Sequence, residues 1–223
     1  MPMENRIVIS DMMGTLTAGS PVLGLVDWVR HNQSRTRASL FMVSIMPSYF
    51  FAKRGWIDWQ KWGQDLMVDS LGLIRDVTPE KFAQVAEWTV EHNLWPKRRE
   101  DVIARLAQHI DSGAQVHIAS SVFEPGVAAF AKRFGAQAIG TPVEFINGRV
   151  RMASDLVASE RKIEQVLSRL KVDRVDFAYG DSMMDVPLLE HADHPVAVYP
   201  DVKLRAFARE RGWEILGDTP SYP

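Results

Sequence analysis

Polar and charged side chains follow three short apolar runs of the sequence, at points where they could act on a ligand together. They are Asp11 after residues 6–10 (RIVIS), Ser120 and Ser121 after residues 115–119 (QVHIA), and Asp181 and Asp185 after residues 175–179 (VDFAY). The runs are rich in β-branched and aromatic residues, which is typical of buried parallel strands. Ligands bind beyond the carboxyl ends of such strands. The sequence therefore predicts that these side chains form one site.

The carboxylates of this set indicate a cation. Asp181 and Asp185 stand four residues apart in GDSMMD, so they repel each other unless a positive charge lies beside them. Mg²⁺ takes a few carboxylates together with carbonyl, water and phosphate oxygens. Lys162 lies in the first turn of a predicted helix, where the positive end of the helix dipole disfavours a cation. Together these groups form a coherent set for phosphoryl transfer.

The elements that position this set alternate between strands and helices. Helical patterns occupy residues 124–135, with Gly135 as a stop signal, and residues 159–172, with Ser159 as the N-cap. A further strand at residues 196–199 leads into a helix at residues 202–212. Asn147-Gly148, between alternating apolar residues, predicts a two-residue β-hairpin. The fold class is therefore α/β, a doubly wound (Rossmann-like) parallel sheet with an added hairpin.

Residues 20–95 differ from the rest because they show helical periodicity and no strand pattern. Thr78-Pro79-Glu80 is typical of a helix start. Six of the seven tryptophans lie in this segment, where they either build a separate core or line a pocket over the site. We expect an α/β core domain of residues 1–19 and 96–223, with a helical domain of residues 20–95 inserted after the first strand.

Composition excludes several classes of function. Lys and Arg number 26 against 28 Asp and Glu, which gives no basic field for nucleic acid. The absence of cysteine excludes disulfides, thiolate catalysis and cysteine-ligated metals. No signal-peptide pattern opens the sequence, and the most apolar run, residues 39–51, is too short to span a bilayer and contains Pro47. We expect a cytoplasmic protein without stable membrane insertion; the oligomeric state is left open.

Four motifs, in order and spacing, resemble those of the haloacid dehalogenase (HAD)-like hydrolase superfamily, and within it the phosphoserine-phosphatase-like subfamily IB. They are DMMGT at residues 11–15, VHIASS at residues 116–121, the helix-start Lys162, and GDSMMD at residues 180–185. The resemblance covers residues 6–19 and about 96–216, and it extends to the helical insert only in position and length.

The resemblance implies a phosphatase mechanism and a role for each matching residue. Asp11 is the expected nucleophile that forms an aspartyl-phosphate. Ser120 and Lys162 contact the phosphoryl group, and Asp181 binds Mg²⁺. Asp185 holds a metal-bound water or orients Lys162. The expected substrate-binding residues are Gly14, Thr15, Ser120, Ser121 and Lys162, with the backbone N–H groups of the Gly14-Thr15 loop facing the phosphate. The helical insert then acts as a cap that selects a small phosphorylated substrate.

Met13 departs from the family pattern, because a second aspartate normally stands there as the general acid and base. A methionine retains only its backbone carbonyl, so the implied metal ligands are Asp11, the Met13 carbonyl and Asp181. Loss of a positioned acid or base commonly lowers a rate by about 10² to 10⁴-fold. Met13 therefore puts in question the hydrolysis of ordinary phosphomonoesters, which the resemblance implies, but not the fold.

Several explanations of Met13 stay open. A phosphatase could draw its acid or base from the substrate or from the insert, where the candidates are His31, Asp58, Asp65 and Asp69. The chain could instead bind a phosphorylated ligand without turnover, or cleave another bond, as a phosphonatase with Lys53 or Lys61 as its Schiff base. Intact GDSMMD argues against a dehalogenase, which has no phosphate charge to balance. Finally, Met13 could be an engineered replacement of the family's second aspartate, in which case the natural protein would keep the usual phosphatase mechanism.

Overall fold

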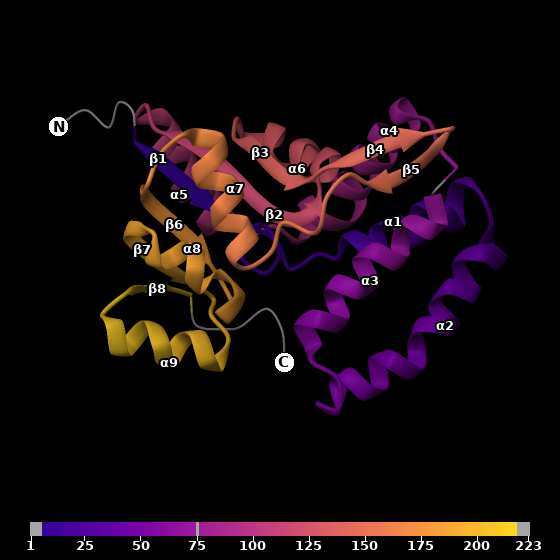
Figure 1. Ribbon diagram of the computed structural model, residues 1–223, viewed down its shortest axis with the longest axis horizontal. Coiled ribbons are helices and arrows are strands. Elements are labelled where there is room, and N and C mark those ends of the chain that lie inside the picture. The colour runs from indigo at the N-terminus through magenta and orange to yellow at the C-terminus, as the bar shows by residue number, and fades with distance from the viewer. Residues whose placement is uncertain (1–5, 75, 218–223) are drawn as a thin grey trace.

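A six-stranded parallel sheet forms the centre of the protein. The computed structural model describes residues 6–74 and 76–217 (Figure 1), so both ends of the expected core domain lie outside the described residues. The sheet has the order β3-β2-β1-β6-β7-β8, and every neighbouring pair is parallel. Its strands are β1 (Ile7–Ser10), β2 (Gln115–Phe123), β3 (Gln137–Thr141), β6 (Val175–Gly180), β7 (Ala192–Val198) and β8 (Glu214–Leu216).

Side chains of successive residues in the central strands pack into two separate hydrophobic cores, one on each face of the sheet. Val8 and Ile118 pack into the cluster on one face of the sheet, whereas their neighbours Ile9 and Ala119 pack into the cluster on the other. Because side chains alternate along a strand, an apolar run without polar interruptions is buried on both sides. Helices cover both faces, which confirms the doubly wound α/β fold class.

The helices divide between the two cores. The first core contains side chains of α5 (Glu100–Asp111) and α6 (Glu124–Ala131). The second contains side chains of α7 (Glu160–Leu170), α8 (Val186–Glu190) and α9 (Val202–Arg211). Short 3-10 turns are η2 (Trp95–Lys97), η3 (Lys132–Phe134) and η4 (Met183–Asp185). Asp201 caps α9 by accepting the Leu204 N–H at 2.7 Å, and Gly135 ends η3 in the left-handed conformation.

The segment between β1 and α5 is helical, as its periodicity indicates. It consists of α1 (Pro21–Asn32), α2 (Arg35–Lys53), α3 (Trp59–Ile74), α4 (Pro79–Thr89) and the π-helical turn η1 (Val90–Leu94). Thr78 caps α4, as expected, by accepting the Lys81 N–H. Figure 1 shows α1, α2 and α3 lying to one side of the sheet. None of the helices among the described residues has both the length and the apolar character needed to cross a bilayer.

The chain enters and leaves this helical segment at one place. The Thr17 hydroxyl donates to the Leu94 carbonyl at 2.6 Å, the Ala18 N–H donates to the Lys97 carbonyl, and the Ser20 N–H donates to the Asn93 side chain at 2.8 Å. These bonds hold the two segments that connect the helices to the sheet side by side, so the chain enters and leaves the helical segment through a short double link.

The expected hairpin is present as β4 (Val143–Ile146) and β5 (Arg149–Met152), with positive φ at both Asn147 and Gly148. Other expectations need correction. The strands β3 and β8 are additional to the predicted ones. Ser159 occupies the N-cap position of α7, but its side chain makes no capping hydrogen bond. Its φ of 49° places it outside the extended region that capping residues normally adopt.

Candidate active site

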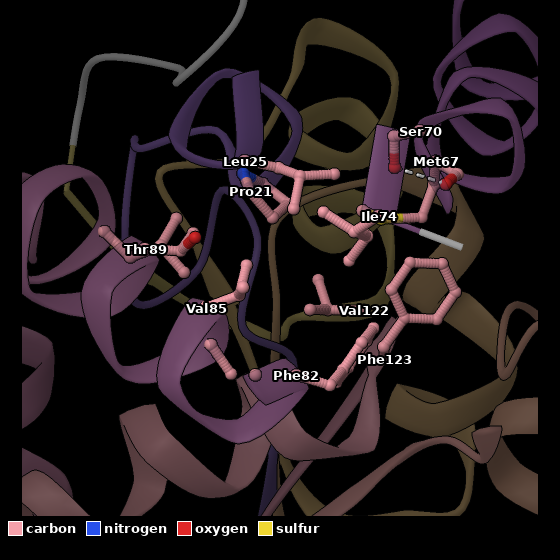
Figure 2. A pocket seen from close by; sticks show the side chains of 13 residues that line it. Pro21, Leu25, Met67, Ser70, Ile74, Phe82, Val85, Thr89, Val122 and Phe123 are labelled. Atoms are coloured by element: carbon pink, nitrogen blue, oxygen red, sulfur yellow. Dashed lines mark hydrogen bonds between the residues drawn. The ribbon is translucent and has the colours of Figure 1, made fainter. Parts of the chain in front are cut away.

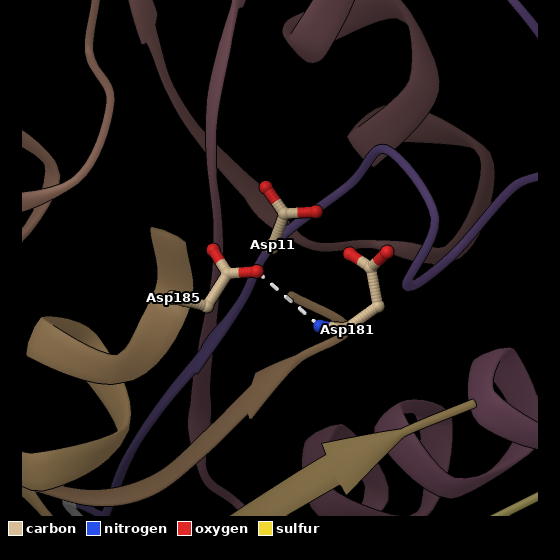
Figure 3. A group of neighbouring side chains, drawn as sticks. All are labelled: Asp11, Asp181 and Asp185. Carbon is tan, nitrogen blue, oxygen red and sulfur yellow. Dashed lines mark hydrogen bonds between the residues drawn. The ribbon is translucent and has the colours of Figure 1, made fainter. Parts of the chain in front are cut away.

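The order of the strands brings the sequence-predicted carboxylates together. β1 lies between β2 and β6, so Asp11 at the end of β1 and Asp181 at the end of β6 emerge side by side. The Asp11 N–H donates to the Tyr179 carbonyl at 2.9 Å, which fixes the exit of β1 against β6. Asp11 and Asp181 are each 5% exposed and Asp185 is 2% exposed. The three carboxylates surround one point, as Figure 3 shows.

Lys162 supplies the positive charge of this group. Its Nζ lies 2.7 Å from Asp11 Oδ1 and 2.6 Å from Asp185 Oδ1, and the residue is 4% exposed. Burial favours the neutral amine, but the Asp11 and Asp185 carboxylates outweigh it and raise the pKa of Lys162 above its ordinary value. The first turn of α7 therefore places the Lys162 ammonium group between two carboxylates. Their attraction offsets the unfavourable interaction of this cation with the positive end of the helix dipole.

Asp185 has partners on both of its oxygens. While Oδ1 accepts from Lys162, Oδ2 accepts from the Asp181 N–H at 3.2 Å, from the Ser182 N–H at 3.3 Å and from the Ser182 hydroxyl at 3.2 Å. Gly180 makes this possible, because a Cβ there would lie 2.4 Å from the Asp185 Cβ. The side chain of Asp185 is thus fixed, with one oxygen directed at Lys162.

Asp181 is held by the loop that follows Asp11. The Thr15 hydroxyl donates to Asp181 Oδ1 at 3.1 Å. Gly14 has a φ of +86°, and a Cβ on it would lie 2.0 Å from Asp181 Oδ2. The Gly14 N–H donates to the Thr17 carbonyl at 2.9 Å, so it is engaged within the loop in this structure. The glycine also lets the Asp181 carboxylate approach the backbone.

Replacing Gly14 by alanine is expected to displace the Asp181 carboxylate and to remove the stabilisation that we expect from added Mg²⁺. The matched control is Gly135→Ala, because Gly135 has a similar φ of +83° and open space around its Cβ position. Both variants carry the strain of a left-handed alanine, about 1 kcal/mol. We expect a rise in melting temperature with Mg²⁺ for wild type and Gly135→Ala only. An equal rise for Gly14→Ala would contradict the contact.

Asp11 has one oxygen engaged and one free. Oδ1 accepts from Lys162, whereas Oδ2 is buried and has no hydrogen-bond partner among the described residues. Burial raises the pKa of Asp11 to about 6, against the opposing effect of Lys162. Burial and the neighbouring carboxylates likewise raise the pKa of Asp181 well above its ordinary value. A buried, partnerless carboxylate oxygen is costly, so this oxygen marks the place of a ligand.

The donor set fits a hard divalent cation. Asp11, Asp181 and Asp185 each offer a carboxylate oxygen, and these atoms lie within 4.8 Å of one another. One lysine balances three carboxylates here, which leaves excess negative charge in a buried site. A cation would remove the repulsion that raises the pKa of Asp181. Oxygen ligands of this kind suit hard cations such as Mg²⁺, Ca²⁺ and Mn²⁺ better than softer metals that prefer nitrogen or sulfur ligands.

Ser120 and Ser121 lie inside β2 rather than after it, which corrects the expected end of that strand. The pairing of β2 with β3 shifts register between Ala119 and Phe123, so both serines fall in an irregular stretch. Ser120 is fully buried, and its Oγ accepts the Val122 N–H at 3.4 Å. No acceptor for its hydroxyl proton is found in the described part of the chain. The Ser121 carbonyl accepts from the Thr141 hydroxyl.

Met13 lies half-buried, and its side chain packs against the first core rather than standing free. The candidates for a replacement acid are exposed. His31 hydrogen-bonds the Asp27 carbonyl within α1, and the Asp58 carboxylate accepts the Lys61 N–H at the start of α3. Asp65 and Asp69 are exposed on α3, and Lys53 and Lys61 are exposed as well. Among the described residues, no hydrogen bond or ion pair joins any of these side chains to the carboxylates of the site.

Two side chains near the site were missed from the sequence. The Gln64 side chain, on α3, donates to Met184 Sδ at 3.8 Å and so links the helical segment to the loop carrying Asp181 and Asp185. Arg99 donates to the Gly14 carbonyl at 2.8 Å across 85 residues of sequence. Neither had a signal in the sequence, because both are ordinary polar residues of helical or loop segments whose partners are remote.

The helical segment also meets the sheet through apolar surface. A cavity between them is lined by α1, α3, α4 and the end of β2, and Figure 2 shows the mainly apolar side chains around it. Val122 and Phe123, which follow Ser120 in β2, belong to this lining. The helical segment and the sheet are thus joined by apolar packing as well as by the hydrogen bonds around Thr17.

Comparisons with known proteins agree with this geometry. The model of the family described as haloacid dehalogenase-like hydrolase matches residues 8–190. A phosphoserine phosphatase of Mycobacterium tuberculosis is 32% identical over 140 residues, covering 59% of this chain and 44% of that protein. The aligned part of the chain thus spans less than half the length of this curated relative.

Solved structures share the fold. A protein of unknown function from Bordetella pertussis Tohama I superposes with a TM-score of 0.74 at 22% identity, over 96% of this chain and 99% of that one. A probable phosphoserine phosphatase from Vibrio cholerae gives a TM-score of 0.59 at 18% identity, over 92% and 59%. Because the family model spans most of the chain, the chain belongs to the haloacid dehalogenase-like hydrolase family.

Proposed function

We propose that the protein is a Mg²⁺-dependent phosphomonoester hydrolase that works through an aspartyl-phosphate on Asp11. The observation that carries this proposal is the state of the Asp11 carboxylate. Lys162 holds Oδ1 at 2.7 Å, while Oδ2 is buried without a partner among the described residues. One oxygen is thus oriented and the other is free to attack.

The reaction has two steps. Asp11 Oδ2 forms a bond to phosphorus as the bond to the leaving oxygen breaks, and that oxygen takes a proton from water or from the substrate. Water then attacks phosphorus, phosphate leaves, and the Asp11 carboxylate is restored. Lys162 balances the charge of the phosphoryl oxygens, and the free hydroxyl proton of Ser120 binds one of them.

Asp11, Asp181 and the Met13 carbonyl are the proposed metal ligands. Bound Mg²⁺ would offset the negative charge of the phosphoryl group. Because both oxygens of Asp185 are engaged, we assign Asp185 to holding Lys162 rather than to direct ligation. We propose both that a metal ion binds at this site and that the ion is Mg²⁺.

The helical segment is the proposed cap domain. We assign residues 20–95 to the cap and residues 1–19 and 96–223 to the core domain. The double link around Thr17 and Leu94 supports this division, because an insertion with adjacent ends can move as a unit. The Gln64–Met184 contact supports a position of the cap over the site. The substrate proposed is a small phosphorylated molecule, and a cytoplasmic location stays a prediction.

The second candidate function is binding of a phosphorylated ligand without turnover, and Met13 is the observation that favours it. A phosphonatase has less support, because Lys53 and Lys61 are exposed on the helical segment. Both alternatives keep the Mg²⁺ site and differ from a phosphatase in whether inorganic phosphate is released from a phosphomonoester.

We expect the purified chain to release phosphate from a reactive aryl phosphate only when Mg²⁺ is present. Asp11→Asn should abolish the release, because an amide oxygen is a poor nucleophile. The control is Asp193→Asn, at an exposed carboxylate in a surface ion pair with Arg174. A wild-type rate equal to that of Asp11→Asn, on a panel of phosphomonoesters, would contradict the hydrolase. Stabilisation by such a ligand without turnover would support the binding protein instead.

A further inference from the structure

Helix α2 is apolar on two opposite sides, and only one of them is covered. On the inner side Ala38 and Ala52 are buried, and Phe41 and Met42 pack against the first core. We call the opposite side the α2 outer face. Its members are Leu40, Val43, Met46, Phe50 and Phe51, which are 66%, 68%, 49%, 55% and 43% exposed. A helix that is apolar all round normally has partners all round.

The members of the α2 outer face form a continuous stripe. Steps of three and four residues, from Leu40 to Val43 and from Met46 to Phe50, keep side chains on one side of a helix. Trp56 extends the stripe past the end of α2, because it is 69% exposed and stacks on Phe51 with ring centres 5.5 Å apart. Figure 1 shows α2 at the edge of the molecule, on the far side of the helical segment from the sheet. A stripe of this extent marks an interaction surface.

The charged residues of α2 and of the turn that follows it have one sign, and the neighbouring α3 segment carries the carboxylates of Asp58, Asp65 and Asp69. Residues 33–57 contain Arg35, Arg37, Lys53 and Arg54 and no acidic residue, although the whole chain has a net charge of −2. Arg35, Lys53 and Arg54 are exposed, and no carboxylate of the described residues forms an ion pair with them. Arg37 donates to the Gly72 carbonyl. Exposed cations therefore stand at both ends of the α2 outer face, and the Arg54 guanidinium lies over the Trp56 ring, 6.0 Å from its centre.

This charge pattern favours an anionic partner over a second copy of the chain as the molecule that covers the α2 outer face. A second copy of the chain would bring Arg35 or Lys53 against a like charge whether the two α2 helices ran parallel or antiparallel, because the segment has no carboxylate to offer. An anionic partner has no such conflict. Exposed apolar side chains, flanking cations and an edge tryptophan are together the features of a helix that lies in the boundary between lipid headgroups and acyl chains.

We propose that the α2 outer face docks the protein onto an anionic phospholipid surface. Leu40, Val43 and Phe50 enter the headgroup–acyl boundary, and Arg35, Lys53 and Arg54 contact the lipid phosphates. Docking of this kind is peripheral and does not depend on the reaction at Asp11. The anionic leaflet of a membrane attracts such a cluster of cations over a distance of about 10 Å.

Cosedimentation of the full chain with vesicles tests this directly. One set of vesicles is phosphatidylcholine alone, and the other contains equal parts of phosphatidylcholine and phosphatidylglycerol. We expect binding to the second set, a fall in binding at high salt, and weak binding to the first set. Each basic residue near an anionic surface strengthens partitioning about fivefold. The triple variant Arg35→Gln, Lys53→Gln, Arg54→Gln should therefore bind roughly 100-fold more weakly.

A second variant separates the apolar contribution from the charges. Leu40→Gln with Val43→Gln keeps every cation and should also abolish binding. Both side chains are more than half exposed, so the fold should be retained. The matched control is Val202→Gln with Lys203→Gln, at an exposed valine and lysine at the start of α9. This control should bind like wild type.

Three results would overturn the proposal. The first is equal binding of wild type to both sets of vesicles, or to neither. The second is equal binding of wild type and the two α2 variants. The third is a dimer in light scattering that Leu40→Gln with Val43→Gln converts to a monomer, because the α2 outer face would then be covered by a second copy.

Discussion

Replacing Met13 by aspartate is expected to raise the rate of phosphomonoester hydrolysis by about 10² to 10⁴-fold, the range associated with a positioned general acid or base. The other groups of the site are in place: Lys162 contacts Asp11 and Asp185, and Thr15 holds Asp181. The gain should be larger for alkyl phosphates than for aryl phosphates, because a poor leaving group depends more on protonation. The measurement is kcat/KM for both substrate types.

The matched control for this change is Met13→Asn. Asparagine has nearly the shape of aspartate but cannot transfer a proton, so its rate should stay close to that of wild type. If Met13→Asp and Met13→Asn gave the same rate while both retained stabilisation by Mg²⁺, the missing acid would not be what limits the reaction. The site would then be that of a binding protein, or its acid would come from elsewhere.

Lys162→Met is expected to destabilise the protein by about 3 kcal/mol at neutral pH, because removing one partner leaves buried charges uncompensated. Lys162 is 4% exposed and is the partner of both Asp11 and Asp185. The same change should abolish phosphate release. Urea unfolding in the presence of a chelator measures the first effect, and a phosphate assay measures the second.

The loss of stability in Lys162→Met should depend on pH in a defined direction. The pKa of Asp11 is raised to about 6 even with Lys162 present, and it rises further without the ammonium group. A carboxyl with a raised pKa in the folded state keeps its proton there more readily than in the unfolded chain, so stability falls as pH rises. The defect of Lys162→Met should therefore shrink as pH falls below about 6, because Asp11 is then protonated in the folded state of both proteins.

The control for Lys162 is an exposed ion pair. Arg174 and Asp193 lie 3.0 Å apart with side chains 54% and 61% exposed. Because surface pairs contribute at most about 1 kcal/mol, Arg174→Met should have a small effect that does not change between acid and neutral pH. A similar loss for both variants would mean that Lys162 does not balance buried charge.

Local patterns were enough to predict the central strands and the carboxylates that follow them. Strands β1 and β6 are rich in β-branched and aromatic residues, and a parallel sheet brings their carboxyl ends to one edge, so the proximity of Asp11 and Asp181 follows from sequence. Strands β3 and β8 have no signal of this kind, because neither carries a regular alternation or a long apolar run. Their existence depends on pairing with neighbours that are remote in sequence.

Details of the site depended on contacts that no local pattern contains. The register shift that keeps Ser120 and Ser121 within β2 arises from pairing with β3. The Gly14 N–H turned out to bond the Thr17 carbonyl, and only the structure reveals the close approach of Asp181 that requires glycine there. Likewise, the apolar run at residues 39–51 has the composition of a core helix, and only its packing shows that one side of α2 is uncovered.

Asp11 is the proposed nucleophile, and trapping the phosphorylated enzyme tests this role most directly. Without a base at position 13 to activate water, the second step should be slow, so an aspartyl-phosphate should accumulate during turnover of an aryl phosphate with Mg²⁺. Acid quenching followed by peptide mass spectrometry should find the phosphoryl group on the peptide that contains Asp11. The amount should fall in Met13→Asp and vanish in Asp11→Asn. Phosphate release with no phosphoryl group on this peptide at any time, or with the group on another residue, would contradict the mechanism.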